Sequence, residues 1–301
     1  MTTTTAPLPE IVSVSVAGGT FKDDLRATKM VWKRELIRYS RNRVRIVTSL
    51  AQPVLFLLVL GSGLSPIVRS GPGAHVDFKT FMFPGVIAMT ILFTAIFSAV
   101  SIVWDREFGF LREMLVAPIR RGALVTGKSL GGATVATLQG VIMLALAPLV
   151  HVPWSPILIL ELLALMAMCA AMLTSIGVLA ASRMQQVESF QVVMQLFVLP
   201  MFFLSGAVFP LSNLPGWLGA LTKIDPVSYI VDPMRRAVFD HINVSAPPEV
   251  QSWPALGVVA AAGGARARAG ARLDPHLPGF LGEDVLQARL TLATVLRGDP
   301  R

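Results

Sequence analysis

Charged side chains leave five long gaps in this chain of 301 residues. Asp, Glu, Lys and Arg are absent from residues 46–68, 80–104, 129–160, 162–182 and 189–222. A helix needs about 20 apolar residues to cross a bilayer, and each gap is at least that long. The pattern predicts an all-α polytopic membrane protein with five transmembrane helices.

The segment before the first gap, residues 21–45, has apolar and basic positions at helical spacing. Leu25, Trp32 and Leu36 fall on one stripe, and cations recur on another. Tryptophan prefers the headgroup zone and cations attract anionic lipid, so we expect an amphipathic helix on the membrane surface. Residues 1–20 have no basic stretch that leads into an apolar one, so we expect a flexible tail rather than a signal peptide.

Composition and charge fit this picture. Hydrophobic residues make up 53% of the chain and charged residues 15%, whereas soluble proteins carry about 25% charged residues. The net charge is +8, with nine Lys and Arg before the first gap and five between the second and third. Positive charge beside spans marks the cytoplasmic side, so we expect a multi-pass protein of the plasma (inner) membrane with a cytoplasmic N-terminus. Membrane lipids, and not nucleic acid, are then the expected partners of these cations.

A glycine-containing stretch, GALVTGKS at residues 122–129, fits the P-loop pattern of ATPases. A P-loop needs a buried strand before it and an acidic residue that holds the metal, yet residues 129–160 contain no acid. Small residues at this spacing also let helices approach closely in lipid, and Lys128 can reach the interface from the end of a span. We expect no catalytic residue, no metal site and no cofactor, and we assign helix packing to Gly127, Gly131, Gly132 and Gly140.

The loop between the second and third gaps, residues 105–120, carries the most specific pattern. It begins with Asp-Arg-Glu at the end of a span, passes Gly109 and continues as a short amphipathic helix that Pro118 ends. A short helix along the cytoplasmic face is suited to docking a soluble partner. An ordinary connector that lies on the membrane is the alternative.

Two parts of the chain resemble one family of membrane proteins. The run EFGFLREMLVAP at residues 107–118 resembles the signature of the membrane subunits of ABC-2 type ABC transporters. It is most similar to permeases of the daunorubicin/doxorubicin-resistance type from actinobacteria. The stretches MFFLSGAVFPLSNLPGWL at 201–218 and IDPVSYIVDPMRRAVF at 224–239 follow in the family's order.

The resemblance implies a half-transporter without an ATPase site of its own. Such a permease pairs with a second copy of itself and with two copies of a separate P-loop ATP-binding subunit, which holds the ATP and Mg²⁺. Residues 105–120 would be the coupling helix, 21–45 the connecting helix and 46–254 the transmembrane domain. The residues implied to couple to the ATPase are Glu107, Gly109, Phe110, Arg112, Glu113, Leu115 and Pro118.

Polar residues inside the gaps are candidates for a translocation path. Glu161 lies near the start of its span, close enough to the outer interface for water to reach it. Gln139, Gln191 and Gln195 either line a path or bond between helices. The gap at 189–222 is longer than one crossing, which indicates a partly re-entrant outer end.

The C-terminal segment, residues 255–301, departs from the family pattern of six spans. Its apolar part is short, and a longer helix would bury several arginines at about 3 kcal/mol each near the bilayer centre. Two models stay open. Either the chain has five spans with the tail outside, or a short re-entrant sixth helix returns the tail to the inside.

The leading functional hypothesis is ATP-driven export of an amphipathic drug, antibiotic or lipid-like molecule, as the resemblance implies. A lipid-linked glycan is the alternative cargo. A proton-coupled secondary transporter would need titratable groups deep in the spans, where the chain offers Glu161 and little else. A membrane scaffold without transport activity would leave the matching stretches unexplained.

Overall fold

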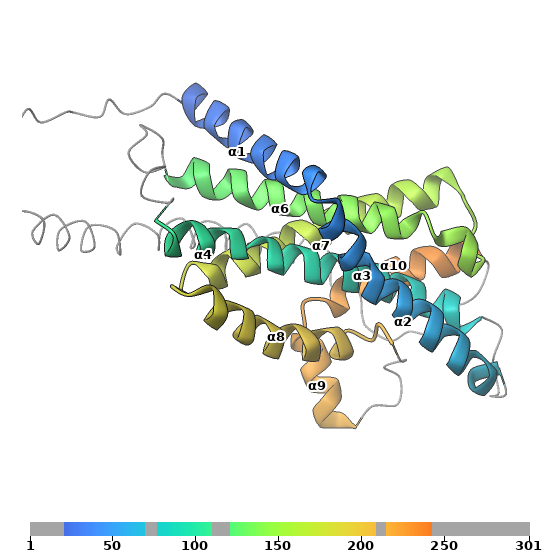
Figure 1. Ribbon diagram of the computed structural model, residues 1–301. Helices are drawn as coiled ribbons and strands as arrows, with labels where there is room; N and C mark the ends of the chain where they lie inside the picture. The colour runs from blue at the N-terminus through green and yellow to red at the C-terminus, as the bar shows by residue number, and fades with distance from the viewer. Residues whose placement is uncertain (1–20, 70–76, 110–120, 209–214, 243–301) are drawn as a thin grey trace, which may run out of the picture.

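The computed structural model describes residues 21–69, 77–109, 121–208 and 215–242, and these ranges form helices joined by short turns (Figure 1). The expected all-helical class is confirmed, since no strand occurs within these ranges. The N-terminal tail, most of the predicted coupling helix and the C-terminal segment 255–301 lie outside the described residues.

Four stretches are long and apolar enough to cross a membrane, as the sequence predicts. They are Arg43–Ser65, Phe78–Glu107, Pro156–Ala181 and Val187–Leu204. The corresponding helices are α2 (Arg43–Arg69), α3 (Phe78–Ser98) with α4 (Val100–Glu107), α7 (Pro156–Ala181) and α8 (Val187–Leu204). The other helices are α1 (Phe21–Arg41), α6 (Arg121–Leu144), α9 (Gly216–Ile224) and α10 (Ser228–His241).

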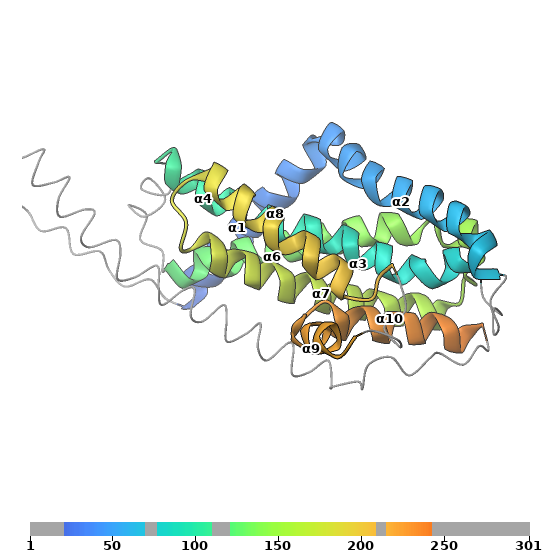
Figure 2. The same ribbon diagram turned by 90° about the horizontal axis from the view of Figure 1, so that it is seen from below.

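The long helices run along one common direction and give the bundle two ends (Figure 1, Figure 2). At one end, here called the α4 end, α4 and α7 stop and α6 and α8 begin. At the other, the α10 end, α6 and α10 stop and α3 and α7 begin. Both names are used in this sense below.

The third predicted span differs from expectation. α6 begins before the charge-free gap at 129–160 and stops at Leu144, well short of the end of that gap. Proline disfavours a helical residue before it, and Pro148 lies within a 3-10 turn, η1 (Ala147–Val150), instead of in a continued α-helix. α6 is long enough to cross a membrane, but its first half is rich in Gly, Ser and Thr, and it is not among the four apolar spans.

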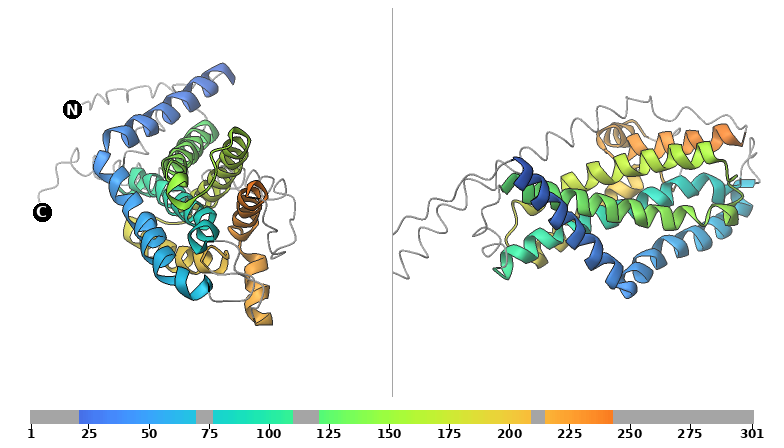
Figure 3. Two further views of the ribbon diagram at one scale, coloured as in Figure 1. Left: turned by 90° about the vertical axis from the view of Figure 1, so that its right-hand side faces the viewer. Right: turned by 90° about the horizontal axis from the view of Figure 1, so that it is seen from above.

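α1 packs alongside the first half of α6 (Figure 3). A Cβ added to Gly127 would lie 2.8 Å from the Cβ of Val31, and one added to Gly131 would lie 2.8 Å from the Cβ of Glu35. Both distances are shorter than real Cβ contacts, so the approach of the two helices depends on glycine. α1 therefore covers the small and polar face of α6.

The amphipathic helix expected at 21–45 thus packs against α6, and it is shorter than expected. Trp32 donates its indole N–H to Thr134 Oγ1 on α6 at 3.0 Å. The helix ends at Arg41, since the next residue, Asn42, is not helical. The Asn42 Oδ1 accepts a hydrogen bond from the backbone N–H of Arg45 at 3.0 Å and so caps the start of α2.

The opposite face of α6 packs into the bundle. A Cβ added to Gly140 would lie 2.9 Å from Met166 Sδ on α7 and 3.1 Å from Ile91 Cδ1 on α3. Gly132 adjoins α3 and the side chain of Thr174 on α7. α6 is thereby a central helix, with small residues on two faces.

α8 stops inside the bundle, before the α10 end. Its 18 residues rise about 27 Å, which is less than the roughly 30 Å hydrocarbon core of a bilayer. The chain leaves α8 through Gly206, whose φ of 72° is a conformation that favours glycine. The next residue, Ala207, packs its backbone against Gly85, which lies about 10 Å along α3 from its first residue.

Residues of α10 bond to carbonyl groups at the end of α8 and just after it. Ser228 Oγ lies 3.4 Å from the carbonyl oxygen of Leu204, and the Arg235 guanidinium donates to the carbonyl oxygen of Gly206. Arg235 is only 3% exposed, and its guanidinium carbon lies 4.0 Å from the centroid of the Phe81 ring. A buried helix end must find donors for its carbonyl groups, so these contacts allow α8 to end where it does.

The turn between α9 and α10 holds a buried carboxylate, Asp225, outside the four candidate spans. Its Oδ1 accepts a hydrogen bond from the backbone N–H of Val227 at 3.1 Å, and its Oδ2 lies 3.2 Å from Ser228 Oγ. Burial raises the pKa of Asp225 from 3.8 to about 7, and these hydrogen bonds offset only part of that effect.

The stability of the protein should depend on pH through Asp225. The folded protein holds this proton more tightly than the unfolded chain, so the ionised carboxylate opposes folding. The opposition is absent below about pH 4, grows between pH 4 and 7 and is complete above that range. Asp225→Asn keeps an oxygen acceptor for the Val227 N–H and cannot ionise. We expect its melting temperature, relative to the parent, to be higher at about pH 8 than at about pH 5. Thermal unfolding in detergent measures this, and an equal difference at both pH values would contradict it.

The contact between α1 and α6 can be tested at its glycines. Gly127→Leu pushes a side chain into Val31 and should lower the free energy of unfolding by about 1–3 kcal/mol. Gly122→Leu is the matched control on the same helix, because no atom lies within 4 Å of a Cβ added there. Thermal unfolding of the purified variants compares them. A loss as large in the control would show that leucine disturbs α6 itself and not its contact with α1.

Candidate functional site

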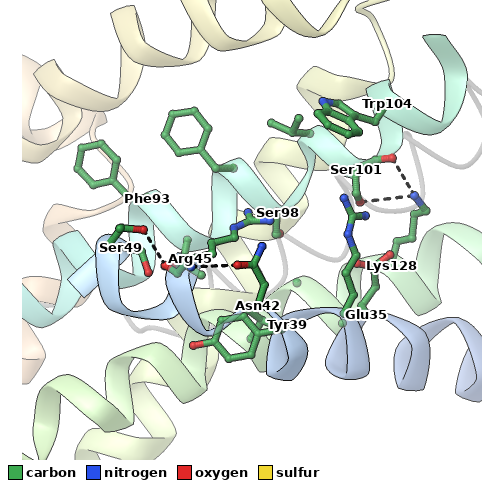
Figure 4. A pocket seen from close by; sticks show the side chains of 18 of the residues that line it. Glu35, Tyr39, Asn42, Arg45, Ser49, Phe93, Ser98, Ser101, Trp104 and Lys128 are labelled. Atoms are coloured by element: carbon green, nitrogen blue, oxygen red, sulfur yellow. Dashed lines mark hydrogen bonds between the residues drawn. The ribbon is translucent and has the colours of Figure 1, made fainter. Parts of the chain in front are cut away.

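A cavity of about 610 Å³ lies in the half of the bundle nearer the α4 end (Figure 4). One wall comes from α3 and α4 and carries the aromatic side chains Phe93, Phe97 and Trp104. The facing wall comes from the corner between α1 and α2. It is polar and includes Arg38, Tyr39, Asn42, Arg45, Ser49 and Gln52. The α3–α4 wall also carries Thr94, Ser98 and Ser101. Aromatic rings that face a polar wall are the arrangement expected of a site for an amphipathic small molecule.

Four charged side chains form an ionic cluster at the rim of this cavity. Lys128 Nζ donates to Asp105 Oδ2 and, at 3.1 Å, to the carbonyl oxygen of Ser101 (Figure 4 draws the Ser101 contact). Arg34 Nη2 lies 3.6 Å from Asp105 Oδ2 and 3.4 Å from Glu35 Oε1. The Lys128 side chain is 4% exposed, so its charge needs these partners. The cluster joins α1, α4 and α6.

Gln139, expected either to line a path or to bond between helices, is fully buried and bonds between helices. Its Oε1 accepts a hydrogen bond from the Tyr39 hydroxyl, and its Nε2 donates to Ser49 Oγ at 2.6 Å and to the carbonyl oxygen of Ile46 at 3.3 Å. Burial raises the pKa of Tyr39, and the charge of Arg45 offsets part of the shift. The hydroxyl therefore keeps its proton, and α6 holds both arms of the α1–α2 corner.

Arg106 and Glu107, at the end of α4, bond to both sides of the turn between α7 and α8. Arg106 Nη1 donates to the carbonyl oxygens of Met184 at 2.8 Å and Ser182 at 3.3 Å, just after α7. Glu107 Oε2 accepts a hydrogen bond at 2.8 Å from the backbone N–H of Val187, the first residue of α8. A cation at a helix C-terminus and an anion at a helix N-terminus both complement the helix dipole. The two side chains fix the end of α4 to α7 and α8.

Two of the seven residues expected to couple to an ATPase are described. Glu107 is engaged within the chain, and its contact with a partner stays a prediction. Gly109 has a φ of 76°, with open space around its Cβ position, so the chain turns there in a conformation that favours glycine. The others, Phe110, Arg112, Glu113, Leu115 and Pro118, lie outside the described residues.

The stretch GALVTGKS is helical throughout, because α6 covers residues 121–144. A P-loop is a loop whose backbone N–H groups converge on phosphate, and its lysine must be able to reach that phosphate. Here the chain forms helix instead, and Lys128 is held by Asp105. The P-loop interpretation is excluded, and of the two glycines in this stretch Gly127 serves packing against α1.

Among the remaining predicted path residues, Glu161 near the start of α7 lies apart from the two glutamines on α8. Gln191 on α8 lines the cavity, whereas Gln195, one turn further along α8, and Glu161 on α7 are exposed. Within the part of the chain that the structure describes, no group of three or more His, Cys, Asp and Glu could hold a metal ion.

Neither the ionic cluster nor the cationic wall of the cavity was predicted from the sequence. Arg34 and Asp105 were placed beside the gaps as flanking charge, and their pairing joins segments that lie far apart in the chain. The available signal was that opposite charges stand at the edges of two gaps, on Asp105 and Lys128.

Comparisons with known proteins cover most of the described helices. The family model described as ABC-2 type transporter matches residues 26–239. The chain is 29% identical over 201 residues to the probable multidrug ABC transporter permease YbhR of Escherichia coli (strain K12), which covers 66% of this chain and 54% of that protein. It is 28% identical over 215 residues to nodulation protein J of Rhizobium leguminosarum bv. trifolii, which covers 70% of this chain and 80% of that protein.

A third relative, the putative transport permease ycf38 of Cyanophora paradoxa, is 25% identical over 206 residues and covers 67% of this chain and 71% of that protein. The chain therefore spans about half the length of YbhR and more of the other two. The narrower resemblance to the daunorubicin/doxorubicin-resistance type stays a prediction.

The ionic cluster can be tested by a double-mutant cycle on Lys128 and Asp105. Lys128→Met leaves Asp105 without its closest partner and should cost about 3 kcal/mol of stability. Asp105→Asn/Lys128→Met removes both charges and should recover most of that loss, because the two groups are coupled. Thermal unfolding in detergent measures the parent, the two single variants and the double variant. Lys33→Met, at an exposed cation on α1, sets the baseline. Additive losses in the double variant would contradict the pairing.

Proposed function

The chain belongs to the ABC-2 type transporter family, and we propose that it is the membrane permease subunit of an ATP-driven exporter. It moves an amphipathic drug, antibiotic or lipid-like molecule out of the cell, with energy from a separate ATP-binding subunit. The observation that carries this proposal is the cavity near the α4 end, where an aromatic wall faces a polar and cationic one.

The proposed orientation places the α4 end in the cytoplasm. Basic residues cluster at 22–45, before the span in α2, and at 105–128, between the span that ends with α4 and the body of α6. Positive charge beside spans marks the cytoplasmic side. In this orientation the cavity opens in the inner half of the plasma membrane. The cavity then lies at the same depth as the polar head of an amphipathic molecule in the inner leaflet.

The proposed assembly has two copies of this chain and two ATP-binding subunits, which bind the ATP and Mg²⁺. In it, residues 21–45 form the connecting helix, 46–254 the transmembrane domain and 105–120 the coupling helix. α6 supplies a fifth crossing in addition to the four apolar spans. This chain contributes no catalytic residue, and the ATPase acts on it through a rigid-body change.

The contacts at the end of α4 support residues 105–120 as the coupling element. Arg106 and Glu107 stand directly before the rest of that segment and bond to the ends of α7 and α8. A displacement of the segment therefore reaches three helices at once. One of them, α8, lines the cavity through Gln191.

Two other functions compete with this proposal. Export of a lipid-linked glycan differs only in cargo, and the mixed lining of the cavity agrees with it as well. A proton-coupled secondary transporter needs titratable groups deep in the spans, but Glu161 is exposed near the start of α7. ATP-driven export of an amphipathic molecule accounts better for the cavity.

The proposal is tested by purifying the tagged chain from its host's membranes in mild detergent and identifying bound proteins by mass spectrometry. We expect a P-loop ATPase subunit at stoichiometric level. Glu113→Arg reverses a charge in the proposed coupling helix and should lower the recovered ATPase by at least about tenfold, because it replaces a charge-assisted contact with repulsion.

Asp240→Arg is the matched control, since it makes the same change on an exposed acid of α10, at the opposite end of the bundle. It should retain the ATPase at the level of the parent. Recovery of the parent chain without any ATPase subunit, or equal recovery with Glu113→Arg and the parent, would overturn the proposal.

A further inference from the structure

The charges that line the cavity do not cancel. The ionic cluster at its rim contains two cations, Arg34 and Lys128, and two anions, Glu35 and Asp105, which pair within it. Arg38 and Arg45 also line the cavity and add two positive charges. The polar wall therefore carries a net positive charge that the cluster does not neutralise.

Neither of these two arginines has an ion-pair partner of its own within the described ranges 21–69, 77–109, 121–208 and 215–242. They lie close enough to repel each other electrostatically, and Glu35, the carboxylate that acts on Arg45, is already held by Arg34. Two like charges side by side are unfavourable unless an anion lies between them. Arginine is also the side chain best suited to hold a carboxylate or phosphate in a bidentate contact.

The surroundings of the arginines complete a headgroup site. Asn42 and Gln52 offer hydrogen-bonding groups on the same wall, and Figure 4 shows Arg45 and Asn42 on the side facing Phe93. The aromatic rings across the cavity give an alkyl chain a surface to pack on. Charge and polarity at the corner and apolar rings opposite match a molecule with an anionic head and an apolar tail.

We propose that the cavity binds an anionic amphiphile, with its phosphate or carboxylate group between Arg38 and Arg45 and its apolar tail along the α3–α4 wall. That this amphiphile is the cargo rests on the proposed function, since a bilayer lipid that stays bound presents the same chemistry. That the amphiphile binds rests on the cavity alone. Cationic amphiphiles are disfavoured at this site.

Photocrosslinking of the full-length chain tests the site. The protein is placed in phosphatidylcholine nanodiscs that contain a small fraction of phosphatidic acid with a diazirine in its acyl chain, and a parallel sample contains the matching photoactivatable phosphatidylcholine. We expect phosphatidic acid to crosslink more strongly, at peptides that contain residues of the cavity walls. Arg38→Gln/Arg45→Gln should lower this crosslinking by about tenfold, because two charge-assisted contacts are lost.

Arg41→Gln/Arg43→Gln is the matched control. It removes the same charge from the same corner, at two exposed arginines that do not line the cavity. It should change the crosslinking less than about twofold, as expected for general surface attraction. Equal losses in the two double variants, or no preference for phosphatidic acid in the parent, would overturn the proposal. If Arg38→Gln/Arg45→Gln does not fold, the lipid preference and the labelled peptides of the parent decide it, and labels outside the cavity count against it.

A second arm distinguishes cargo from resident lipid. The complex with its ATPase is reconstituted in vesicles that contain fluorescent phosphatidic acid. ATP-driven movement that Arg38→Gln/Arg45→Gln abolishes identifies the anionic amphiphile as cargo. Crosslinking without any ATP-driven movement assigns the same headgroup site to a resident lipid. Absence of an ATPase partner would defeat the proposed function and leave the crosslinking result standing.

Discussion

The buried side chains of Lys128 and Gln139 on α6 need hydrogen-bonding partners inside the protein, because burial withdraws them from water. Lys128 finds Asp105 and Ser101 on α4, and Gln139 finds Tyr39 and Ser49 on either side of the α1–α2 corner. The partners thus come from three other helices. α6 also presents glycine to α1, so close backbone approach joins these two helices, and hydrogen bonds hold the corner that follows.

The same contacts determine where the cavity lies. α6 fixes the α1–α2 corner at Gln139, and the ionic cluster fixes α1 to α4 at the rim. Between these two attachments the polar side chains of the corner face the aromatic side chains of α3 and α4 across open space. The substrate site that we propose is therefore a consequence of how one membrane helix satisfies its polar residues.

The sequence predicted the four apolar spans because charge is excluded from hydrocarbon, so each crossing leaves an uncharged run of about 20 residues. It did not predict the end of α6 at Leu144 or the short α8, because both depend on prolines, a glycine turn and contacts with distant segments. The sequence also did not predict the cavity. The Tyr39–Gln139 contact joins residues 100 positions apart, and single-sequence patterns carry no information on such pairs. The coupling segment was predicted from its residues and stays a prediction, and the described residues show only the contacts of Arg106 and Glu107 with the α7–α8 turn.

The short α8 has a consequence for the surrounding bilayer. Its 18 residues span about 27 Å, whereas the candidate span in α2 has 23 residues and spans about 35 Å. Exposed apolar side chains on α8, among them Val192, Leu196 and Phe197, face a thinner hydrocarbon layer than α2 does. Hydrophobic mismatch costs a fraction of a kcal/mol per Å, so the membrane thins beside α8 or the protomer tilts to reduce the difference. A bilayer of shorter acyl chains would match that side of the protein better than a thicker one.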